Sequence, residues 1–397
     1  MMNKQLAYCT NVHAGTDLDG VKANLDRYSL KVKELIAPGQ PMGVGLWIAA
    51  PAARKLLESR RLDEFAVWLS GRGLVPFTIN GFPFGNFHEP VVKERVYHPT
   101  WLESERRDFT LDLVKILHGI LPENTEGSIS TLPIAWGTPA ATGRQLDTAA
   151  RHLGQVAEEL GRLEERTGRL ITLCIEPEPG CVLQRSDDLC LFFDDYLCRS
   201  CPPDVCRRYL RVCHDVCHAA VMFEDQRRVL EGYAARGIRV GKVQVSSALE
   251  VDFDPAGREH GEAVLDALAS FAEDRYLHQT AIRRAPDATP LFFDDLPAAL
   301  AAARQDGNRL RGTWRVHFHV PVYLDRIGLL GTTQPEIREC LQASRAHPDL
   351  VHFEVETYAW SVLPPPLQSG QLVEGIAREM EWVRAVWDSL HLSGRPD

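Results

Sequence analysis

The stretch LITLCIEPEPG at positions 170–180 shows the pattern that decides the fold. Apart from one threonine, its first six residues are apolar on both alternating faces, and Glu176 and Glu178 follow them. Such a run is typical of a strand in a parallel sheet that is covered on both sides. Directly before it, leucines and a valine between positions 146 and 163 recur at helical spacing, with charged residues on the other face. A helix and a strand therefore follow one another here.

The same alternation extends along the chain of 397 residues. Strand-like runs begin at nine positions: Leu6, Gly43, Leu74, Gly127, Leu170, Tyr209, Arg239, Trp314 and Leu350. Further helices are expected at roughly 17–36, 51–70, 102–120, 224–236, 261–275 and 334–346. Repeated strand–helix units predict a parallel sheet. Because no glycine-rich phosphate loop follows the first run, an α/β fold of the closed (β/α)₈ TIM-barrel type is favoured over an open doubly wound sheet.

Nine strand-like runs are one more than such a barrel holds. One of them either is not a barrel strand or belongs to an insertion. Positions from about 249 to 313 are more than a single connecting helix needs, so a decorated late connection is expected there. No convincing linker, internal repeat or low-complexity tract divides the sequence, which predicts one domain over residues 1–397.

The charge balance limits the kinds of partner. The chain carries 44 Lys and Arg against 54 Asp and Glu, and its basic residues are dispersed, so no nucleic-acid partner is expected. No apolar run approaches the roughly 20 residues that cross a bilayer, and the N-terminal stretch lacks the form of a signal peptide. Neither membrane insertion nor export is expected. The predicted location is the cytoplasm, and the predicted partner is a small molecule.

Ten cysteines in a chain of this length are not the density of a disulfide-stapled secreted scaffold. Cys198 and Cys201 form the only pair with zinc-knuckle spacing, and no second pair completes a metal site. A disulfide between these two under oxidation is an alternative. Cys213 and Cys217 are expected to pack as small apolar side chains.

Potential metal ligands gather at the ends of the late strand-like runs. The C-terminal ends of all strands of a TIM barrel meet at one mouth. The residues concerned are Glu176, Glu178, Asp215, His218, Gln244, His317, His319, Glu354 and Glu356. Residues two apart on a strand face the same way, so the outer member of a pair is better placed at the mouth, whereas an inner charge needs a partner. Carboxylates and imidazoles together suit a divalent cation, namely Mn²⁺, Co²⁺, Mg²⁺, Fe²⁺ or Zn²⁺.

Each of these residues has an ordinary alternative role. A glutamate at a strand end is more often a solvated cap or an ion-pair partner, and His317 alone is more often a structural histidine of the core. The ordered series Glu, Asp-x-x-His, His, Glu is harder to obtain by accident, and it predicts a shared metal site. His13, Asn80 and His88 from the early runs, together with Gln244 and His317, are predicted to contact the substrate, with capping or packing as the alternative.

Four short motifs resemble those of a known family. CIEP, HDVCH, HFHV and VET, at positions 174–177, 214–218, 317–320 and 355–357, resemble the metal-binding strand ends of the xylose-isomerase-like TIM barrels, which include ketose 3-epimerases and nucleases of the endonuclease IV type. The resemblance implies that Glu176, Asp215, His319 and Glu356 hold a divalent cation, and that His218 contacts substrate or metal. In one alignment the family's histidine falls on Gln244; aligning HFHV at that strand restores the histidine.

A closer resemblance is carried by YCTNVHAG, NGFPFGNFHE, WRVHFHVP and EVETYAW. These motifs resemble the Ebo metabolite traffic protein E subgroup of the same superfamily, nearly end to end. The resemblance implies a role in making or moving a small metabolite alongside other proteins of one pathway. It leaves the chemical step undefined.

The expected activity is that of a metal-dependent isomerase or epimerase acting on a small polyhydroxylated or carbonyl compound. The cation would chelate adjacent substrate oxygens, and Glu176 and Glu356 would move a proton on either side of one carbon. His218 would orient a hydroxyl group. A non-catalytic metabolite-binding protein is the alternative. An endonuclease IV-type phosphodiesterase is disfavoured by the acidic charge balance.

Overall fold

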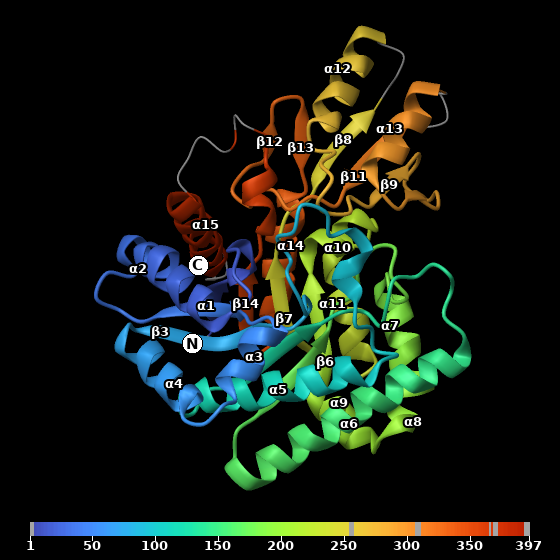
Figure 1. Cartoon of the computed structure of the whole chain (residues 1–397). Helices are drawn as coiled ribbons and strands as arrows, with labels where there is room; N and C mark the ends of the chain where they lie inside the picture. Colours follow the sequence, from blue (N-terminus) through green and yellow to red (C-terminus); the bar gives the residue numbers. More distant parts are fainter. Residues whose placement is uncertain (1–3, 254–257, 306–310, 365–366, 368–371, 393–397) are drawn as a thin grey trace.

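Eight parallel strands form the centre of the molecule (Figure 1), for which the computed structural model describes residues 4–253, 258–305, 311–364, 367 and 372–392. The strands are β1 (Gln5–Tyr8), β2 (Met42–Trp47), β3 (Leu74–Asn80), β4 (Gly127–Thr131), β5 (Ile171–Ile175), β6 (Leu210–Asp215), β7 (Val240–Val245) and β14 (His352–Val355). Their order is β1-β14-β7-β6-β5-β4-β3-β2, and a parallel bridge between Cys9 and Gly45 joins the two edge strands. The predicted α/β TIM barrel is confirmed.

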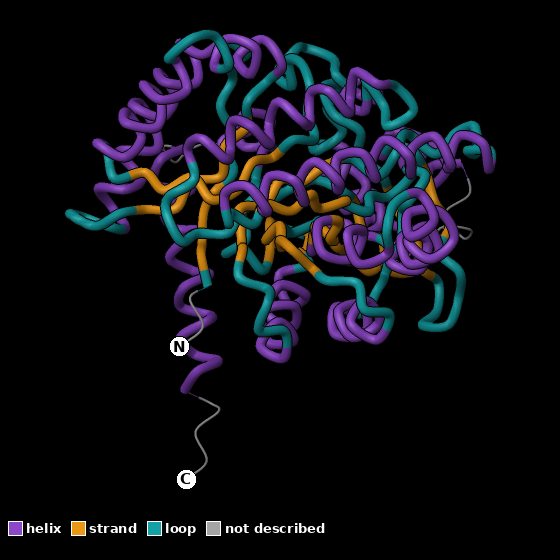
Figure 2. Tube along the Cα trace, turned by 90° about the horizontal axis from the view of Figure 1, so that it is seen from below, coloured by secondary structure: helices purple, strands orange, loops and turns teal. Residues whose placement is uncertain are grey.

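Helices follow the strands and surround them, as the view in Figure 2 shows. They are α1 (Leu18–Asn24), α2 (Leu30–Ile36), α3 (Ala50–Leu56), α4 (Arg61–Gly71), α5 (Ser104–Ile120), α6 (Gly143–Thr167), α7 (Ser186–Phe192), α8 (Cys198–Ser200), α9 (Pro203–Tyr209), α10 (Val216–Val221), α11 (Gln226–Ala235), α14 (Gln334–Ala343) and α15 (Leu372–Leu392). The longest helix, α6, shows how the sequence sets the two ends of a helix. Thr142 and Gln145 form a capping box at its start, and Gly168, with a φ of 70°, ends it. The apolar stripe of α6 is buried from Leu153 to Leu163, as its spacing predicts, whereas Leu146 is half-buried.

A second sheet lies in the connection between β7 and α14, above the barrel in Figure 1. Its antiparallel strands are β8 (Leu249–Phe253), β9 (Thr280–Arg283), β10 (Leu291–Phe293), β11 (Gly312–Val316), β12 (Arg326–Ile327) and β13 (Leu330–Thr332). Two helices accompany it, α12 (Arg258–Ala269) and α13 (Leu296–Gln305). The run that begins at Trp314 is therefore not a barrel strand, because β11 pairs with β8 and β9. This accounts for the ninth run in the sequence.

A buried ion pair fills the interior of the barrel. Lys242 Nζ on β7 lies 2.6 Å from Glu354 Oε2 on β14, and both side chains are fully buried. Burial alone would lower the pKa of Lys242, but the Glu354 carboxylate outweighs burial and raises that pKa above its ordinary value. Gly45 on β2 makes room for this pair, because a Cβ there would lie 1.4 Å from Glu354 Oε1. The inward glutamate of the VHFEVET run thus has the partner that its burial requires.

The cysteines are free thiols in this structure. Cys213 and Cys217 are completely buried, in keeping with their expected packing role. Cys198 Sγ lies 3.6 Å from Cys206 Sγ. The sulfur in contact with Cys198 therefore belongs to a residue outside the CxxC motif of Cys198 and Cys201. Among the described residues, no helix combines the length and apolarity needed to cross a bilayer.

Candidate metal centre

Three carboxylates from separate barrel strands meet at the C-terminal mouth. Glu176 directly follows β5, Asp215 is the last residue of β6, and Glu356 directly follows β14. One oxygen from each lies within 4.8 Å of the others. All three side chains are buried. The convergence of strand ends in a barrel therefore brings together residues that are up to 180 positions apart in the sequence.

The three carboxylates repel one another because they are close together and buried away from water. Burial raises the pKa of Glu176 well above its ordinary value, and the charges of Glu356 and Asp215 raise it further. The pKa of Glu356 is likewise raised well above its ordinary value, by burial and by Asp215. Burial would also raise the pKa of Asp215, but this pKa lies below its ordinary value because His218, His319 and the hydrogen bonds from the His218 amide and the Ser246 hydroxyl together favour the carboxylate. A cation between the three groups would remove the repulsion.

Hydrogen bonds fix two of the three carboxylates, those of Glu356 and Asp215. Asn11 Nδ2 and Asn80 Nδ2 each donate to Glu356 Oε1 at 2.7 Å. Ser246 Oγ donates to Asp215 Oδ1 at 2.7 Å. In the described part of the chain, the buried atoms Glu176 Oε2 and Asp215 Oδ2 have no hydrogen-bond partner. Buried oxygens of this kind are costly unless something else binds them.

A histidine that follows strand β11 of the second sheet lies beside Asp215 of this group. His319 lies three residues beyond β11, and its Nε2 is 4.0 Å from Asp215 Oδ2. Its Nδ1 lies 2.7 Å from the main-chain oxygen of Glu356, which can only accept, so Nδ1 carries the proton. Burial lowers the pKa of His319 to about 4, which keeps the ring neutral. The Nε2 atom is buried, has no hydrogen-bond partner among the described residues, and has its lone pair available.

The donor set fits a divalent cation. Glu176, Asp215, His319 and Glu356 supply three carboxylates and one neutral imidazole, and three of these four residues carry a buried atom without a hydrogen-bond partner in the described structure. This arrangement is typical of a site for Mn²⁺, Co²⁺, Fe²⁺ or Zn²⁺, and it also offers oxygen ligands to Mg²⁺. The four residues are those that the sequence motifs indicate, although His319 reaches the site from outside the barrel.

A pocket opens above the carboxylates, with about 560 Å³ of empty space, part of it open to solvent. Its floor includes Glu176, Glu356 and Asn80. Its walls are largely aromatic and come from Phe82, Phe87, Tyr97, Tyr276 and Tyr358. Rings from distant segments pack edge to face there, for example Phe87 on Tyr358 with centroids 5.3 Å apart. The pocket therefore combines a floor of carboxyl groups with largely apolar aromatic walls.

Three predicted substrate contacts lie outside the residues that line this pocket. His13 stacks on Tyr28 with ring centroids 4.3 Å apart, and burial lowers its pKa to about 3. His88 Nε2 donates to the main-chain oxygen of Asn11 at 2.7 Å. Gln244 is completely buried on β7, beside Asp215 in the strand pairing. The structure thus does not bring these three side chains to the pocket wall, because each is held by the barrel or its first loops.

Asn80 and His317 do line the pocket, as does His218. His218 Nδ1 donates to the main-chain oxygen of Pro177 at 3.0 Å, and His317 Nδ1 donates to Gln279 Oε1 at 2.7 Å. Asn11, which the sequence did not single out as a contact, orients Glu356. Its position in the YCTNVHAG motif, beside the first strand, is the feature of the sequence that could have identified Asn11 as a residue of the site.

The fold and this site define an α/β barrel with a candidate metal centre at its mouth. No protein-family model and no curated protein matches the chain. Solved structures similar to it include a xylose isomerase domain protein from Alicyclobacillus acidocaldarius, with 13% identity over 97% of this chain and 99% of that one and a TM-score of 0.48. The IolI protein with a bound zinc atom has 12% identity, the same coverage and a TM-score of 0.45. AsbF of Bacillus anthracis, a probable 3-DHS dehydratase, has 8% identity over 96% and 98% and a TM-score of 0.44.

Proposed function

We propose that this protein is a metal-dependent isomerase or epimerase of a small hydroxylated carbonyl compound. Glu176, Asp215, His319 and Glu356 would hold the divalent cation. The observation that carries the proposal is the convergence of Glu176, Asp215 and Glu356 beside the pocket, with His319 Nε2 4.0 Å from Asp215 Oδ2. Three of these four residues have a buried ligand atom without a hydrogen-bond partner among the described residues. A cation bound there supplies Lewis-acid polarisation of a carbonyl and its neighbouring hydroxyl.

The chain's own groups would then move the proton. Glu176 would bind the cation through one carboxylate oxygen, and we assign its other oxygen to accept a proton from the carbon next to the carbonyl. Glu356 is held at Oε1 by Asn11 and Asn80, which leaves Oε2 to return a proton. His218, fixed by its bond to the Pro177 oxygen, presents Nε2 as an acceptor for a substrate hydroxyl.

The aromatic walls support this chemistry because they limit water at the reacting carbon. The one lysine on the pocket wall, Lys93, lies 2.6 Å from Asp295 Oδ2 and donates to the oxygen of Tyr276 at 2.7 Å. Its charge is therefore already balanced. We propose a neutral substrate on this ground, and a place in cytoplasmic small-metabolite processing or traffic on the ground of the motif resemblance.

Solvent deuterium exchange tests the proposal. The protein is stripped with a chelator, reloaded with Mn²⁺, Co²⁺ or Zn²⁺, and incubated in D₂O with a panel of ketoses and inososes. Proton NMR should show deuterium entering at the carbon next to a carbonyl. Exchange should fall by at least about 100-fold in Glu176→Gln and Glu356→Gln, the scale of losing an acid–base group.

The control is His13→Gln, which changes a buried histidine outside the pocket lining and should exchange at the wild-type rate. Tight binding of a panel compound without any deuterium uptake, in every metal form, would instead identify a non-catalytic metabolite-binding protein.

A further inference from the structure

Three cysteines gather in the outer helix layer of the barrel, away from its mouth. Cys198 begins α8, Cys201 directly follows α8, and Cys206 lies in α9. Helix α9 ends at Tyr209, directly before β6, so this group lies near the N-terminal ends of the barrel strands. In Figure 1, α8 and α9 lie on the opposite side of the molecule from the second sheet. Chemistry at these thiols is therefore separate from the candidate metal centre.

Hydrogen bonds join the sulfur atoms of this group. Cys198 Sγ donates to Cys206 Sγ at 3.6 Å. A hydrogen bond with Cys206 lowers the pKa of Cys201 below its ordinary value, against the effect of burial. The same bond, together with burial, raises the pKa of Cys206. A proton that leaves the group therefore comes from Cys201, and the chain of S–H donors lets Cys206 and then Cys198 replace it.

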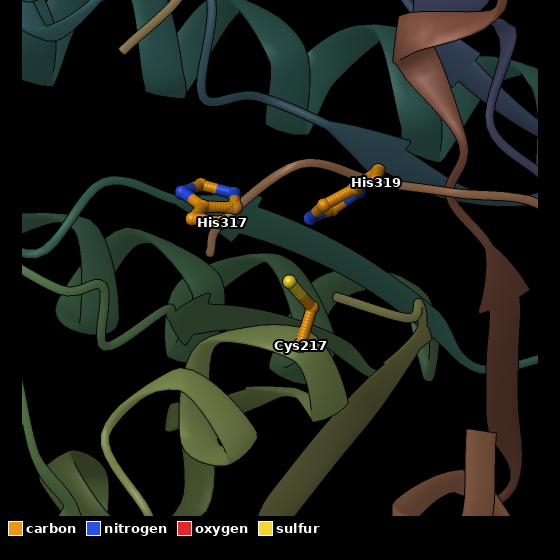
Figure 3. Close-up of side chains that lie close together, drawn as sticks. All are labelled: Cys217, His317 and His319. Atoms are coloured by element: carbon orange, nitrogen blue, oxygen red, sulfur yellow. The ribbon is translucent and has the colours of Figure 1, made fainter. Parts of the chain in front are cut away.

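Other cysteines of the chain are held as neutral thiols. Cys217 is the example at the mouth, where its sulfur faces His317 and His319 (Figure 3). Its side chain is completely buried, and burial raises its pKa well above the ordinary value. Burial likewise raises the pKa of Cys174 and Cys213. Because the thiolate is the reactive form of cysteine, these sulfurs are poor targets for an oxidant.

Solvent reaches the group of three through Cys198. The Cys198 side chain is half-buried, whereas Cys201 and Cys206 are buried. A surface hollow with about 740 Å³ of empty space, part of it open to solvent, is lined by Arg199 and Ser200, which lie between Cys198 and Cys201 in the chain. Hydrogen peroxide is little larger than water, so it would meet the Cys198 sulfur first.

We propose that Cys198 and Cys206 form a peroxide-sensitive pair that closes reversibly into a disulfide. The Cys198 thiolate takes one oxygen atom from hydrogen peroxide: an S–O bond forms, the O–O bond breaks, and the released hydroxide leaves as water with the proton that Cys198 has given up. The Cys206 sulfur then displaces that oxygen, which departs as a second water with the Cys206 proton while the S–S bond forms. Two thiols lose two electrons and two protons, and the peroxide is reduced.

The contact between the two sulfurs decides the partner and the outcome. Because Cys206 Sγ already touches Cys198 Sγ, closure needs only a small shift of the two side chains. A sulfenic acid beside a thiol is captured as a disulfide before peroxide oxidises it to sulfinic acid. Thiols reduce a disulfide again, whereas they do not reduce sulfinic acid. The pair thus protects the half-buried sulfur from permanent oxidation.

Peptide mapping tests the proposal. The full chain is reduced, freed of reductant and treated with a small excess of hydrogen peroxide, and its remaining thiols are blocked with iodoacetamide before digestion with trypsin. Cleavage after Arg199 separates Cys198 from Cys206, so a disulfide between them joins two peptides, whereas a disulfide between Cys201 and Cys206 stays within one. We expect the joined peptides, two fewer reactive thiols than the ten of the reduced chain, and full recovery with dithiothreitol.

Matched variants assign the sulfurs. Cys198→Ser should give no joined peptides. Cys206→Ser should carry sulfinic acid at Cys198, which dithiothreitol does not reverse. Cys201→Ser should form the same joined peptides more slowly, because it lacks the thiol that releases the proton. Cys340→Ser changes a completely buried cysteine of α14 and should match the wild type. Circular dichroism checks folding, and Cys198→Ser, at a half-buried position, serves if Cys206→Ser does not fold.

A disulfide confined to Cys201 and Cys206 would overturn the proposal, as would sulfinic acid at Cys198 of the wild type without joined peptides. Survival of all ten thiols in the folded chain would also overturn it. Joined peptides that form equally fast in the urea-unfolded chain would show that the fold contributes nothing to the reaction.

Discussion

The buried pair of Lys242 and Glu354 shows how strongly single residues constrain this barrel. Both charges lie where no water reaches, and the glycine at position 45 leaves the space that the carboxylate occupies. Removing one partner leaves the other charged and buried, which typically costs about 3–5 kcal/mol. The pair therefore affects the stability of the barrel. It lies one layer of side chains below the candidate metal ligand Glu356.

We therefore expect Lys242→Met to lower the free energy of unfolding by about 3–5 kcal/mol in urea titrations. The double variant Lys242→Met/Glu354→Gln removes both charges and should recover most of that loss. If the double variant were as unstable as the single one, packing and not charge would be the cause.

His319 is the residue whose role is most directly measurable. Its Nε2 is buried, lies 4.0 Å from Asp215 Oδ2 and has no hydrogen-bond partner among the described residues. We expect His319→Ala to weaken binding of Mn²⁺ or Zn²⁺ by more than the roughly 10–100-fold that follows loss of a merely orienting partner. Isothermal titration calorimetry measures this. His352→Ala, another buried histidine, should not change the affinity; equal weakening in both variants would contradict a direct role for His319.

At the level of elements, the sequence predicted the barrel strands and one extra run, but it did not identify β11 as that extra run. Alternating apolar runs ending in polar residues identify strands, and repeated strand–helix units identify a parallel barrel. The WRVHFHV run has the same alternation as a barrel strand, yet it pairs with β8 and β9. Pairing partners depend on the whole chain, so local pattern could not separate the two cases.

The sequence likewise predicts part of the candidate site and leaves the rest open. Glu176, Asp215 and Glu356 follow from strand ends, because the geometry of a barrel fixes where strand ends go. The alternative between Gln244 and His319 could not be resolved from sequence. In the structure Gln244 occupies β7 and His319 reaches Asp215 from the second sheet. Glu178 lies two residues beyond Glu176 in the quoted stretch, and the sequence does not indicate that Tyr97 and Gln279 donate hydrogen bonds to it.

Helix α15 ties the mouth loops to the barrel through one buried carboxyl group. Glu379 accepts hydrogen bonds from Thr357 Oγ1 at 2.6 Å, the Val322 amide at 3.1 Å and Trp360 Nε1 at 3.2 Å. Burial outweighs these donors and raises the pKa of Glu379 to about 7 from 4.5. Between these two values the folded chain keeps a proton that the unfolded chain has lost. Stability from this group is therefore greatest at low pH and falls as pH rises toward 7.

We expect the wild type to lose about 2–3 kcal/mol more than Glu379→Gln between pH 5 and pH 8, because the glutamine cannot ionise. Urea unfolding of both proteins at the two pH values gives the difference. An identical pH dependence in the two proteins would show that Glu379 titrates normally.

For the whole molecule, bound metal should raise stability by mass action. A ligand that binds only the folded chain adds about 2.7 kcal/mol at a concentration 100 times its dissociation constant. We expect Zn²⁺ or Mn²⁺ to raise the melting temperature of the stripped wild type by several degrees, and a chelator to reverse the rise. Asp215→Asn should show a clearly smaller rise. Equal shifts in the two proteins would place the stabilising ion elsewhere on the chain.

The second sheet, inserted between β7 and α14, delivers His317 and His319 to a mouth whose carboxylates come from the barrel. The histidines and the carboxylates of the candidate centre therefore come from separate parts of the chain. A survey of related chains that looks for histidine on the seventh barrel strand would find a glutamine here and miss the candidate centre. Changes in the accessory sheet would alter the histidines of this candidate centre without altering the carboxylates that the barrel strands supply.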